Sequence, residues 1–168
     1  MTSMPDSILA IDPGPMESGF VLFHPCAAGL PLIDEAGIRG NYDLKELCHN
    51  ISSALSLRPM LAIEMIACYG MPVGKETFET CLWIGRFEEA FNPSRDSLRC
   101  YRKDIKLHLC GTTRAKDPNV RQALIDRLGK PGTKKNPGPT YGVRSHVWSA
   151  LAVAVYAADQ LTKANHPT

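Results

Sequence analysis

Short apolar runs bounded by turn residues predict a sheet in the first part of the chain. Residues 7–12 and 18–24 are two such runs joined by a Pro-Gly turn, and residues 31–38 form a third, which together predict an antiparallel meander. Two later apolar runs, at 60–64 and 97–101, predict a fourth and a fifth strand. The first and fourth of these strands both end on an acid, and this shared feature needs an explanation.

Apolar residues at helical spacing predict helices between and after the later strands. Asn41 or Asp43 is placed to cap the first helix, while Pro118 and Gly129 mark the start and end of the fourth. The predicted helices cover residues 41–57, 75–91, 103–111, 117–129 and 144–163.

Aromatic and aliphatic side chains form a stripe along the helix predicted at 75–91. We expect Trp83 in this stripe and Trp148 on the last helix to lie in the core. The segment 130–142 is rich in Lys, Gly and Pro and predicts a flexible, exposed basic loop. The stripe consists of Phe78, Leu82, Trp83, Phe87 and Phe91.

The order of the predicted elements, β-β-β-α-β-α-β-α-α-α, is typical of an α/β fold. It predicts a five-stranded mixed sheet with helices on both faces, in which the fourth and fifth strands run parallel to the first through helical crossovers. The carboxyl ends of the first and fourth strands then lie side by side, which places Asp12 and Glu64 at one edge. A chain of 168 residues fits a single domain over 1–168.

Charge is distributed unevenly along the chain. The formal net charge is only +2, but many of the Lys and Arg residues lie between Arg99 and Lys135. A basic face of this kind favours a polyanionic partner.

The six cysteines form neither a CxxC pair nor a Cys/His pattern of a zinc site. We therefore expect buried, reduced thiols and an intracellular protein. The first residues show no basic segment followed by an apolar core, and no apolar run reaches about 18 residues, so a soluble, cytoplasmic protein is expected.

Asp12 and Glu64 together suggest a cation site. Two carboxylates a few Å apart raise each other's pKa unless a cation joins them. Hard divalent ions accept such oxygen ligands, and paired ions activate water for phosphodiester hydrolysis. The alternative for Asp12 is structural, because Asp before Pro-Gly often begins a turn.

Four segments in order resemble the RuvC-type Holliday junction resolvases of the RNase H-like superfamily, particularly their small phage-type relatives. They are "LAIDPG", "LAIEMIACYG", "TRAKDPNVRQALIDRLG" and the terminal "HVWSALAVAV". The resemblance spans most of the chain. It implies an RNase H-like fold and a homodimer that cleaves branched DNA, four-way junctions above all, in the cytoplasm of a bacterial or phage-infected cell.

The resemblance also implies a site that binds two divalent ions, Mg²⁺ or Mn²⁺. The matching positions are Asp12, Glu64, His146 and Ser149. Ser149 departs from the pattern, because many resolvases have an aspartate there and a hydroxyl is a weak ligand. An imidazole ligand favours Mn²⁺. Glu17 and Asp117 are candidate substitutes for the missing carboxylate, and a surface or capping role is the alternative for His146.

Further residues are candidates for contacts with nucleic acid. Lysine and arginine side chains give salt-sensitive phosphate contacts, for which a solvated charged face is the alternative. The resemblance places an aromatic residue that stacks on bases after the fourth strand, although packing under the loop is an equal alternative. The helix at 75–91 is a candidate dimer interface. The candidate nucleic-acid contacts are Tyr69, Lys103, Lys106, Arg114, Lys116, Lys134 and Lys135.

Three functions therefore follow from the sequence, in order of preference. The first is a metal-dependent endonuclease for branched DNA, and the second is a junction-binding protein with weak or no cleavage, suggested by Ser149. A nuclease for structured RNA is a variant of the first. The third is an ATP-binding protein of the actin and sugar-kinase kind, which is disfavoured because such proteins need two domains.

Overall fold

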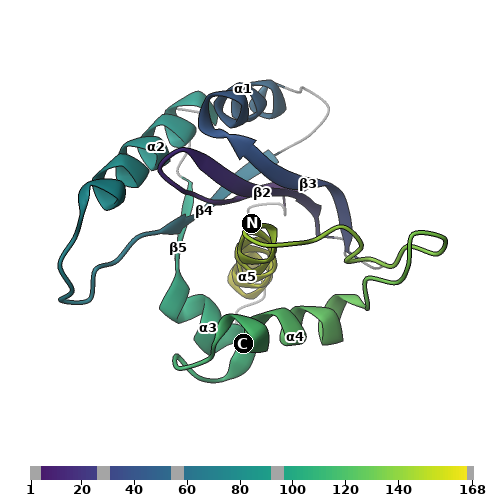
Figure 1. Ribbon diagram of the computed structural model, residues 1–168. Coiled ribbons are helices and arrows are strands. Elements are labelled where there is room, and N and C mark those ends of the chain that lie inside the picture. The colour runs from purple at the N-terminus through teal and green to yellow at the C-terminus, as the bar shows by residue number, and fades with distance from the viewer. Residues whose placement is uncertain (1–4, 26–30, 54–58, 92–96, 166–168) are drawn as a thin grey trace.

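The computed structural model describes residues 5–25, 31–53, 59–91 and 97–165, and it is an α/β structure around one mixed sheet (Figure 1). The strands are β1 (Ser7–Asp12), β2 (Glu17–His24), β3 (Leu32–Gly40), β4 (Pro59–Met65) and β5 (Leu98–Tyr101). The helices are α1 (Asn41–Ser52), α2 (Lys75–Phe91), α3 (Arg102–Cys110), α4 (Asp117–Leu128) and α5 (Val147–Asn165). The predicted order of elements is confirmed.

Strand β1 lies in the middle of the sheet, whose order is β3-β2-β1-β4-β5. It pairs antiparallel with β2 and parallel with β4, and Ile11 lies opposite Ile63 in the parallel pair. Strand β5 runs parallel to β4 with Cys100 opposite Glu64. The predicted mixed sheet and the predicted parallel placement of the fourth and fifth strands are confirmed.

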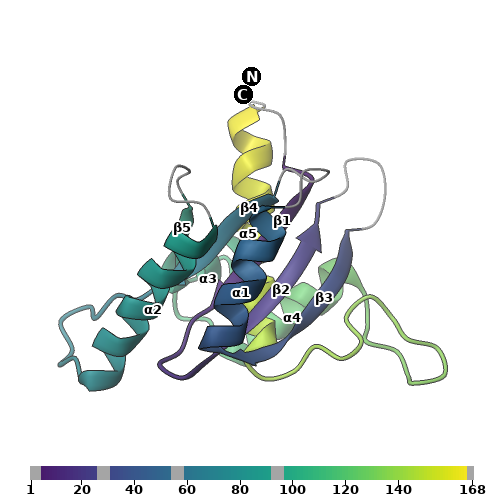
Figure 2. The ribbon, with the colours of Figure 1, turned by 90° about the horizontal axis from the view of Figure 1, so that it is seen from above.

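Both faces of the sheet are covered by helices (Figures 1 and 2). Helices α1 and α2 cover one face, α5 packs on the other, and α3 and α4 lie beyond α5 (Figure 1). Alternating residues of β1 serve the two cores: Leu9 and Ile11 face α1 and α2, whereas Ile8 and Ala10 face α5. A strand buried on both faces reads as a continuous apolar run, as this one does.

The turn after β1 is fixed by a buried polar network. The hydroxyl of Ser18 accepts a hydrogen bond from the Gly14 amide (3.1 Å) and donates to the side chain of Asn41 (2.7 Å), which in turn donates to the Gly14 carbonyl (2.9 Å). The prediction that Asn41 or Asp43 caps α1 is therefore wrong, because Gly40 holds the N-cap position without a side-chain bond. Asn41 instead ties the helix to the turn that follows Asp12.

Several helix boundaries differ by a few residues from the sequence prediction. Helix α5 begins at Val147 rather than at 144, because Ser145 has a positive φ of 46°. Helix α1 ends at Ser52, and the rest of its predicted span lies largely outside the described residues, at 54–58. Helix α4 begins at Asp117, as predicted, with Lys116 as its N-cap, and it ends at Leu128.

The predicted burial is confirmed for the two tryptophans and corrected for part of the cysteines. Trp83 and Trp148 are buried, as expected, but Phe78 and Leu82 are 61% and 63% exposed. Cys48 and Cys100 are buried, as expected, whereas Cys68 and Cys81 are exposed. Cys26 lies outside the described residues. All five described cysteines are free thiols.

The loop at 130–142 is exposed for most of its length and folds back on itself through a bridge between Gly132 and Pro137. Its flexibility stays a prediction. Among the helices that the structure describes, none is long and apolar enough to cross a membrane.

Candidate active site

Asp12 is the last residue of β1 and Glu64 is the last but one of the neighbouring parallel strand β4, so the two acids lie close to the predicted strand ends. Their backbones are adjacent because Ile11 and Ile63, the residues before them, are paired partners. Both side chains are mostly buried, with 15% and 13% of their surface exposed. The negative charge of Asp12 acts on Glu64 strongly enough to raise its pKa, so the two carboxylates share one environment.

His146 joins this pair from the start of α5. Its Nδ1 lies 3.0 Å from Oδ2 of Asp12, and its ring is 66% exposed. The contact depends on Gly19, which lies opposite Asp12 in the sheet: a Cβ there would meet the His146 carbonyl oxygen at 2.7 Å. The absence of a side chain on β2 thus lets the start of α5 approach Asp12.

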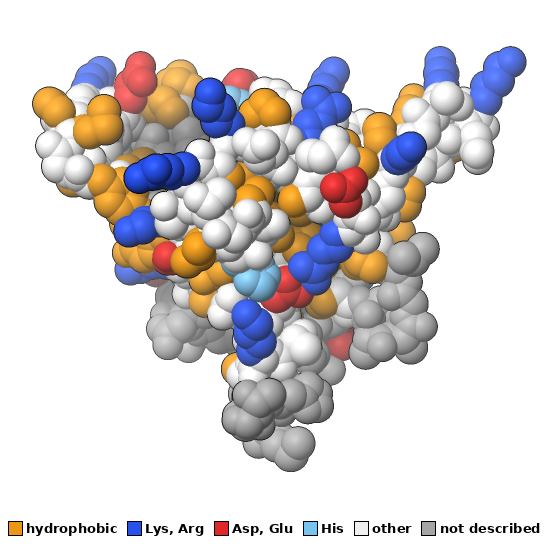
Figure 3. All heavy atoms as spheres, turned by 90° about the horizontal axis from the view of Figure 1, so that it is seen from below, with side chains coloured by type: hydrophobic (Ala, Val, Ile, Leu, Met, Phe, Trp, Pro, Cys, Tyr) orange, Lys and Arg blue, Asp and Glu red, His pale blue; other side chains and the backbone are white. Residues whose placement is uncertain are grey.

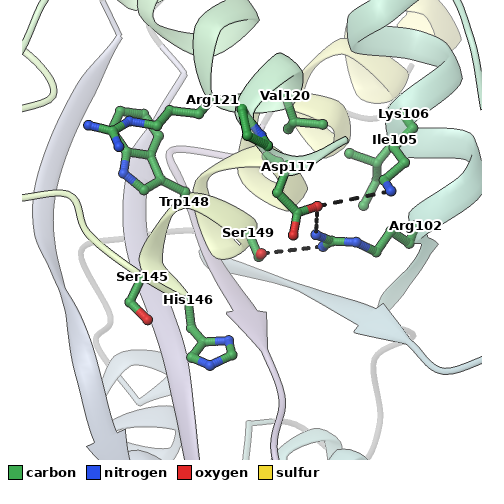
Figure 4. A pocket seen from close by; sticks show the side chains of 12 residues that line it. Arg102, Ile105, Lys106, Asp117, Val120, Arg121, Ser145, His146, Trp148 and Ser149 are labelled. Carbon is green, nitrogen blue, oxygen red and sulfur yellow. Dashed lines mark hydrogen bonds and ion pairs between the residues drawn. The ribbon is translucent and has the colours of Figure 1, made fainter. Parts of the chain in front are cut away.

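Ser149 lies one turn further along α5, and its hydroxyl faces the guanidinium of Arg102 (Figure 4). A hydrogen bond between its hydroxyl and Asp12 lowers the pKa of that carboxyl. All four predicted site residues, Asp12, Glu64, His146 and Ser149, are therefore brought together at one edge of the sheet.

Arg102, the first residue of α3, occupies the centre of this group. Its Nη1 lies 3.1 Å from Oε2 of Glu64 and 3.3 Å from the Ser149 hydroxyl, and its Nη2 donates to Oδ1 of Asp117 at 2.6 Å. Figure 4 shows the bonds from Arg102 to Asp117 and Ser149. The guanidinium thus contacts β4, α4 and α5 at once.

Burial dominates the electrostatics of the two strand-end acids. It raises the pKa of Glu64 to about 7, with Asp12 adding to the increase and Arg102 opposing it. Burial also raises the pKa of Asp12, against the opposing effects of His146, Arg102 and Ser149. A site that holds two acids in this state favours binding of a cation.

Three hollows meet at these residues. The first, of about 430 Å³, lies between α3, α4 and the start of α5, and Lys106, Arg121 and Trp148 are among the residues that line it (Figure 4). The second, of about 250 Å³, runs from Asp12 and Glu64 to Tyr69. The third lies over the β1–β2 turn and reaches His146.

Two of the predicted nucleic-acid contacts line the first and second hollows, and the others lie elsewhere on α3, the α3–α4 connection and the loop at 130–142. Tyr69 is 64% exposed and has a positive φ of 45°, and it lines the second hollow rather than packing under its loop. Lys106 lines the first hollow. Lys103 is on α3, Arg114 and Lys116 lie between α3 and α4, and Lys134 and Lys135 belong to the projecting loop. On the face of the molecule that Figure 3 shows, most of the charged side chains are Lys or Arg.

Sequence reasoning missed Arg102 and Arg121. A signal for Arg102 was available, because a residue directly after a strand parallel to β4 must lie at the same edge as Glu64. No sequence signal marks Arg121, whose guanidinium stacks on Trp148 at 4.9 Å. Of the candidate substitutes for a carboxylate, Asp117 reaches the site through Arg102, and Glu17 lines the third hollow.

The composition of the site limits the metals that it can hold. Within the ranges that the structure describes, no three His, Cys, Asp or Glu side chains gather closely enough to hold a metal ion. Glu64 is instead engaged by Arg102. Two neighbouring carboxylates, Asp12 and Glu64, suffice together with water for one Mg²⁺ or Mn²⁺ ion, and the imidazole of His146, 3.0 Å from Asp12, is a further donor.

The sequence matches no protein-family model and no curated protein. The structure, in contrast, is similar to the RuvC structure of Thermus thermophilus, with a TM-score of 0.68 and 17% identity over 93% of this chain and 96% of that one. It is equally similar, with a TM-score of 0.68 and 17% identity, to T. thermophilus RuvC in complex with Holliday junction substrate, over 92% and 96% of the two chains. The chain therefore has the RNase H-like fold of RuvC.

Proposed function

We propose that this protein is a divalent-metal-dependent endonuclease that cleaves branched DNA, with four-way junctions as its main substrate. The observation that carries the proposal is the meeting of Asp12, Glu64 and His146 at the carboxyl ends of β1 and β4, beside a basic hollow. The fold shared with T. thermophilus RuvC, which has been solved with a Holliday junction substrate, supports the choice of substrate.

Asp12, Glu64 and His146 would hold one Mg²⁺ or Mn²⁺ ion. When bound, such an ion polarises the phosphodiester and lowers the pKa of a bound water, which makes a nucleophile at neutral pH. The chain's own residues would position the strand: Lys106 and Arg121 in the first hollow bind phosphates, and Tyr69 in the second stacks on a base. The remaining predicted contacts at 103, 114, 116, 134 and 135 would extend the phosphate track.

A homodimer fits this substrate, because a two-fold enzyme presents two such sites to the two matching strands of a junction. Exposed apolar side chains on α2 support an interface there. Membership of the phage-type subgroup, and action in a bacterial or phage-infected cell, belong to the same proposal and rest on the sequence motifs.

Cleavage of a labelled four-way junction, compared with a plain duplex of the same sequence, tests the proposal. We expect symmetric nicks in the junction with Mg²⁺ or Mn²⁺, none with EDTA, and little cleavage of the duplex. Asp12→Asn should lower the rate by about a hundredfold or more, as loss of one essential electrostatic group does, while leaving junction affinity intact. An Asp12→Asn variant that cuts as fast as the wild type would refute this site.

The second candidate function is a junction-binding protein without cleavage. The engagement of Glu64 by Arg102 and the neutral Ser149 favour it. Tight, salt-sensitive junction binding with no nicks in either metal would select this function. The same assay with a branched RNA of equal sequence tests the RNA variant, since both nucleic acids share phosphate-dominated contacts.

A further inference from the structure

The guanidinium of Arg102 is held at the candidate active site by three acceptors from three elements. It contacts Glu64 at 3.1 Å, Ser149 at 3.3 Å and Asp117 at 2.6 Å, and only 35% of its side chain is exposed. Lys106, one turn further along α3, lies 4.0 Å from the same Asp117 oxygen. Arg102 is thus a fixed, partly buried cation rather than a mobile surface arginine.

The backbone leaves Arg102 little choice of position. Strand β5 pairs with β4 so that Cys100 lies opposite Glu64, and α3 begins directly after Tyr101. The side chain of the first residue of α3 therefore starts at the sheet edge where Glu64 lies, one residue before the end of β4. Asp117 at the start of α4 holds the outer side of the guanidinium.

Ser149 is matched to this arginine. Its hydroxyl accepts a hydrogen bond from Arg102 and also bonds to Asp12, so it links the cation to the second carboxylate. A carboxylate at this position together with a divalent ion would contribute a net charge of +1. Serine and arginine contribute the same +1 without an ion, since the hydroxyl is neutral and arginine is always charged.

We propose that Arg102 takes the place of one of two divalent ions, so that the site works with one metal ion, held by Asp12, Glu64 and His146, and one built-in cation. This inference rests on the proposed nuclease function. A guanidinium suits the task, because its planar N–H groups bind phosphate oxygens in a fixed geometry and its charge does not depend on metal concentration. Arg102 then stabilises negative charge on the phosphodiester from the side of Ser149.

The pairing predicts a specific interaction between two substitutions. In Ser149→Asp alone, the new carboxylate pairs with Arg102, and no second ion site results. In Arg102→Met combined with Ser149→Asp, the cation is gone and a free carboxylate faces Asp12 and Glu64, so a second ion binds. Ser149 would therefore be the matched partner of Arg102 and not a defective ligand.

Counting bound Mn²⁺ on the full-length protein tests this without relying on cleavage. Calorimetric titration gives the number of ions per chain, and electron paramagnetic resonance detects spin-coupled Mn²⁺ pairs. We expect one ion in the wild type, one in Ser149→Asp, and two, with the coupled spectrum, in the double variant. The second ion should bind about tenfold or more tightly there than any second ion in Ser149→Asp, because the repulsion from a unit charge a few Å away is removed.

Arg99→Met combined with Ser149→Asp is the matched control. Arg99 on β5 pairs with Glu88 on α2 and not with the acids of the candidate site, so this variant should bind one ion. Thermal melting followed by circular dichroism confirms that each variant is folded.

The outcomes separate this inference from the proposed function. Two ions in the wild type, two in Ser149→Asp alone, or one in the folded double variant would overturn the role of Arg102 while leaving a metal-dependent nuclease in place. No bound Mn²⁺ in the wild type would overturn both. A wild-type count of one with a double-variant count of two supports the substitution of an ion by arginine.

Discussion

Glu64 is placed where its charge is costly in the metal-free protein. It is buried near the end of β4 and faces Asp12, and these effects outweigh the compensating charge of Arg102, so its pKa is raised to about 7 from 4.5. A carboxyl whose pKa is higher in the folded than in the unfolded state binds its proton more tightly when folded. Its contribution to stability is therefore complete below pH 4.5 and is lost as the pH rises through about 7.

Glu64→Gln should remove this pH dependence. The amide keeps the shape but carries no charge, so we expect the variant to gain stability relative to the wild type between pH 4.5 and 8, by about 3 kcal/mol, which is the order that such a shift represents. Urea unfolding in EDTA at several pH values measures it. Glu89→Gln, on the exposed face of α2, controls for the loss of a carboxylate as such. Parallel pH profiles for the wild type and Glu64→Gln would contradict the environment described for Glu64.

At the same scale, the sequence predicted the acids but not their cation. Asp12 and Glu64 were found because each ends an apolar run, and runs that pair in parallel bring their ends together. Arg102 follows a strand of only four residues, and its role depends on Asp117 and Ser149, which lie in two other helices. Side chains that converge from three elements leave no periodic pattern in a sequence.

At the scale of elements, the site depends on how closely α5 approaches β2. Gly19 lies beneath the residue that precedes α5, and a Cβ at position 19 would be 2.7 Å from the His146 carbonyl oxygen and 3.0 Å from its Cβ. Alanine residues along α5, among them Ala150 and Ala154, are fully buried against the sheet and permit the same close packing. A side chain at position 19 must therefore displace His146, and with it the contact to Asp12.

Gly19→Ala should reduce both stability and activity. We expect a loss of about 1–3 kcal/mol in the free energy of unfolding, as for other overpacked positions. Cleavage should fall more than this loss explains, because His146 moves away from Asp12. Gly37→Ala on the neighbouring strand β3 is the control, since its Cβ would meet only the Phe20 ring at an ordinary 3.5 Å. Equal effects of the two substitutions on the cleavage rate of folded protein would refute this role for Gly19.

Element types were predictable because they follow local periodicity, whereas the start of α5 and the cap of α1 were not. The start of α5 is set by the positive φ of Ser145 and by the Gly19 contact, which is a tertiary restraint. Asn41 looked like a cap from its position, but the buried Ser18 and the turn at Gly14 offered its side chain better partners. In both cases a distant segment, absent from any local window, decides the local structure.

At the scale of the whole molecule, α2 carries more apolar surface than its own domain can bury. Trp83 and Phe87 fill the core, while Phe78 and Leu82, four residues apart on one face, are 61% and 63% exposed. The periodicity of the sequence could not separate these two sets, because a helix that is apolar on a wide arc satisfies the core pattern whichever part faces inward. Exposed apolar residues next to each other are typical of protein interfaces.

Leu82→Glu should convert the proposed homodimer to a folded monomer, because burying a carboxylate opposite the same residue of a second chain is strongly unfavourable. Sedimentation equilibrium measures the change in mass, and junction cleavage by the monomer should yield single rather than paired nicks. Leu107→Glu on α3, where another leucine is 52% exposed, controls for the chemical change and should stay dimeric. A wild type that sediments as a monomer, or a Leu82→Glu variant that remains a dimer, would rule out α2 as the interface. If the wild type is a monomer, the paired strands of a junction would have to be cut by two independently bound chains, and the rate of paired cleavage would then rise with the square of the protein concentration instead of its first power.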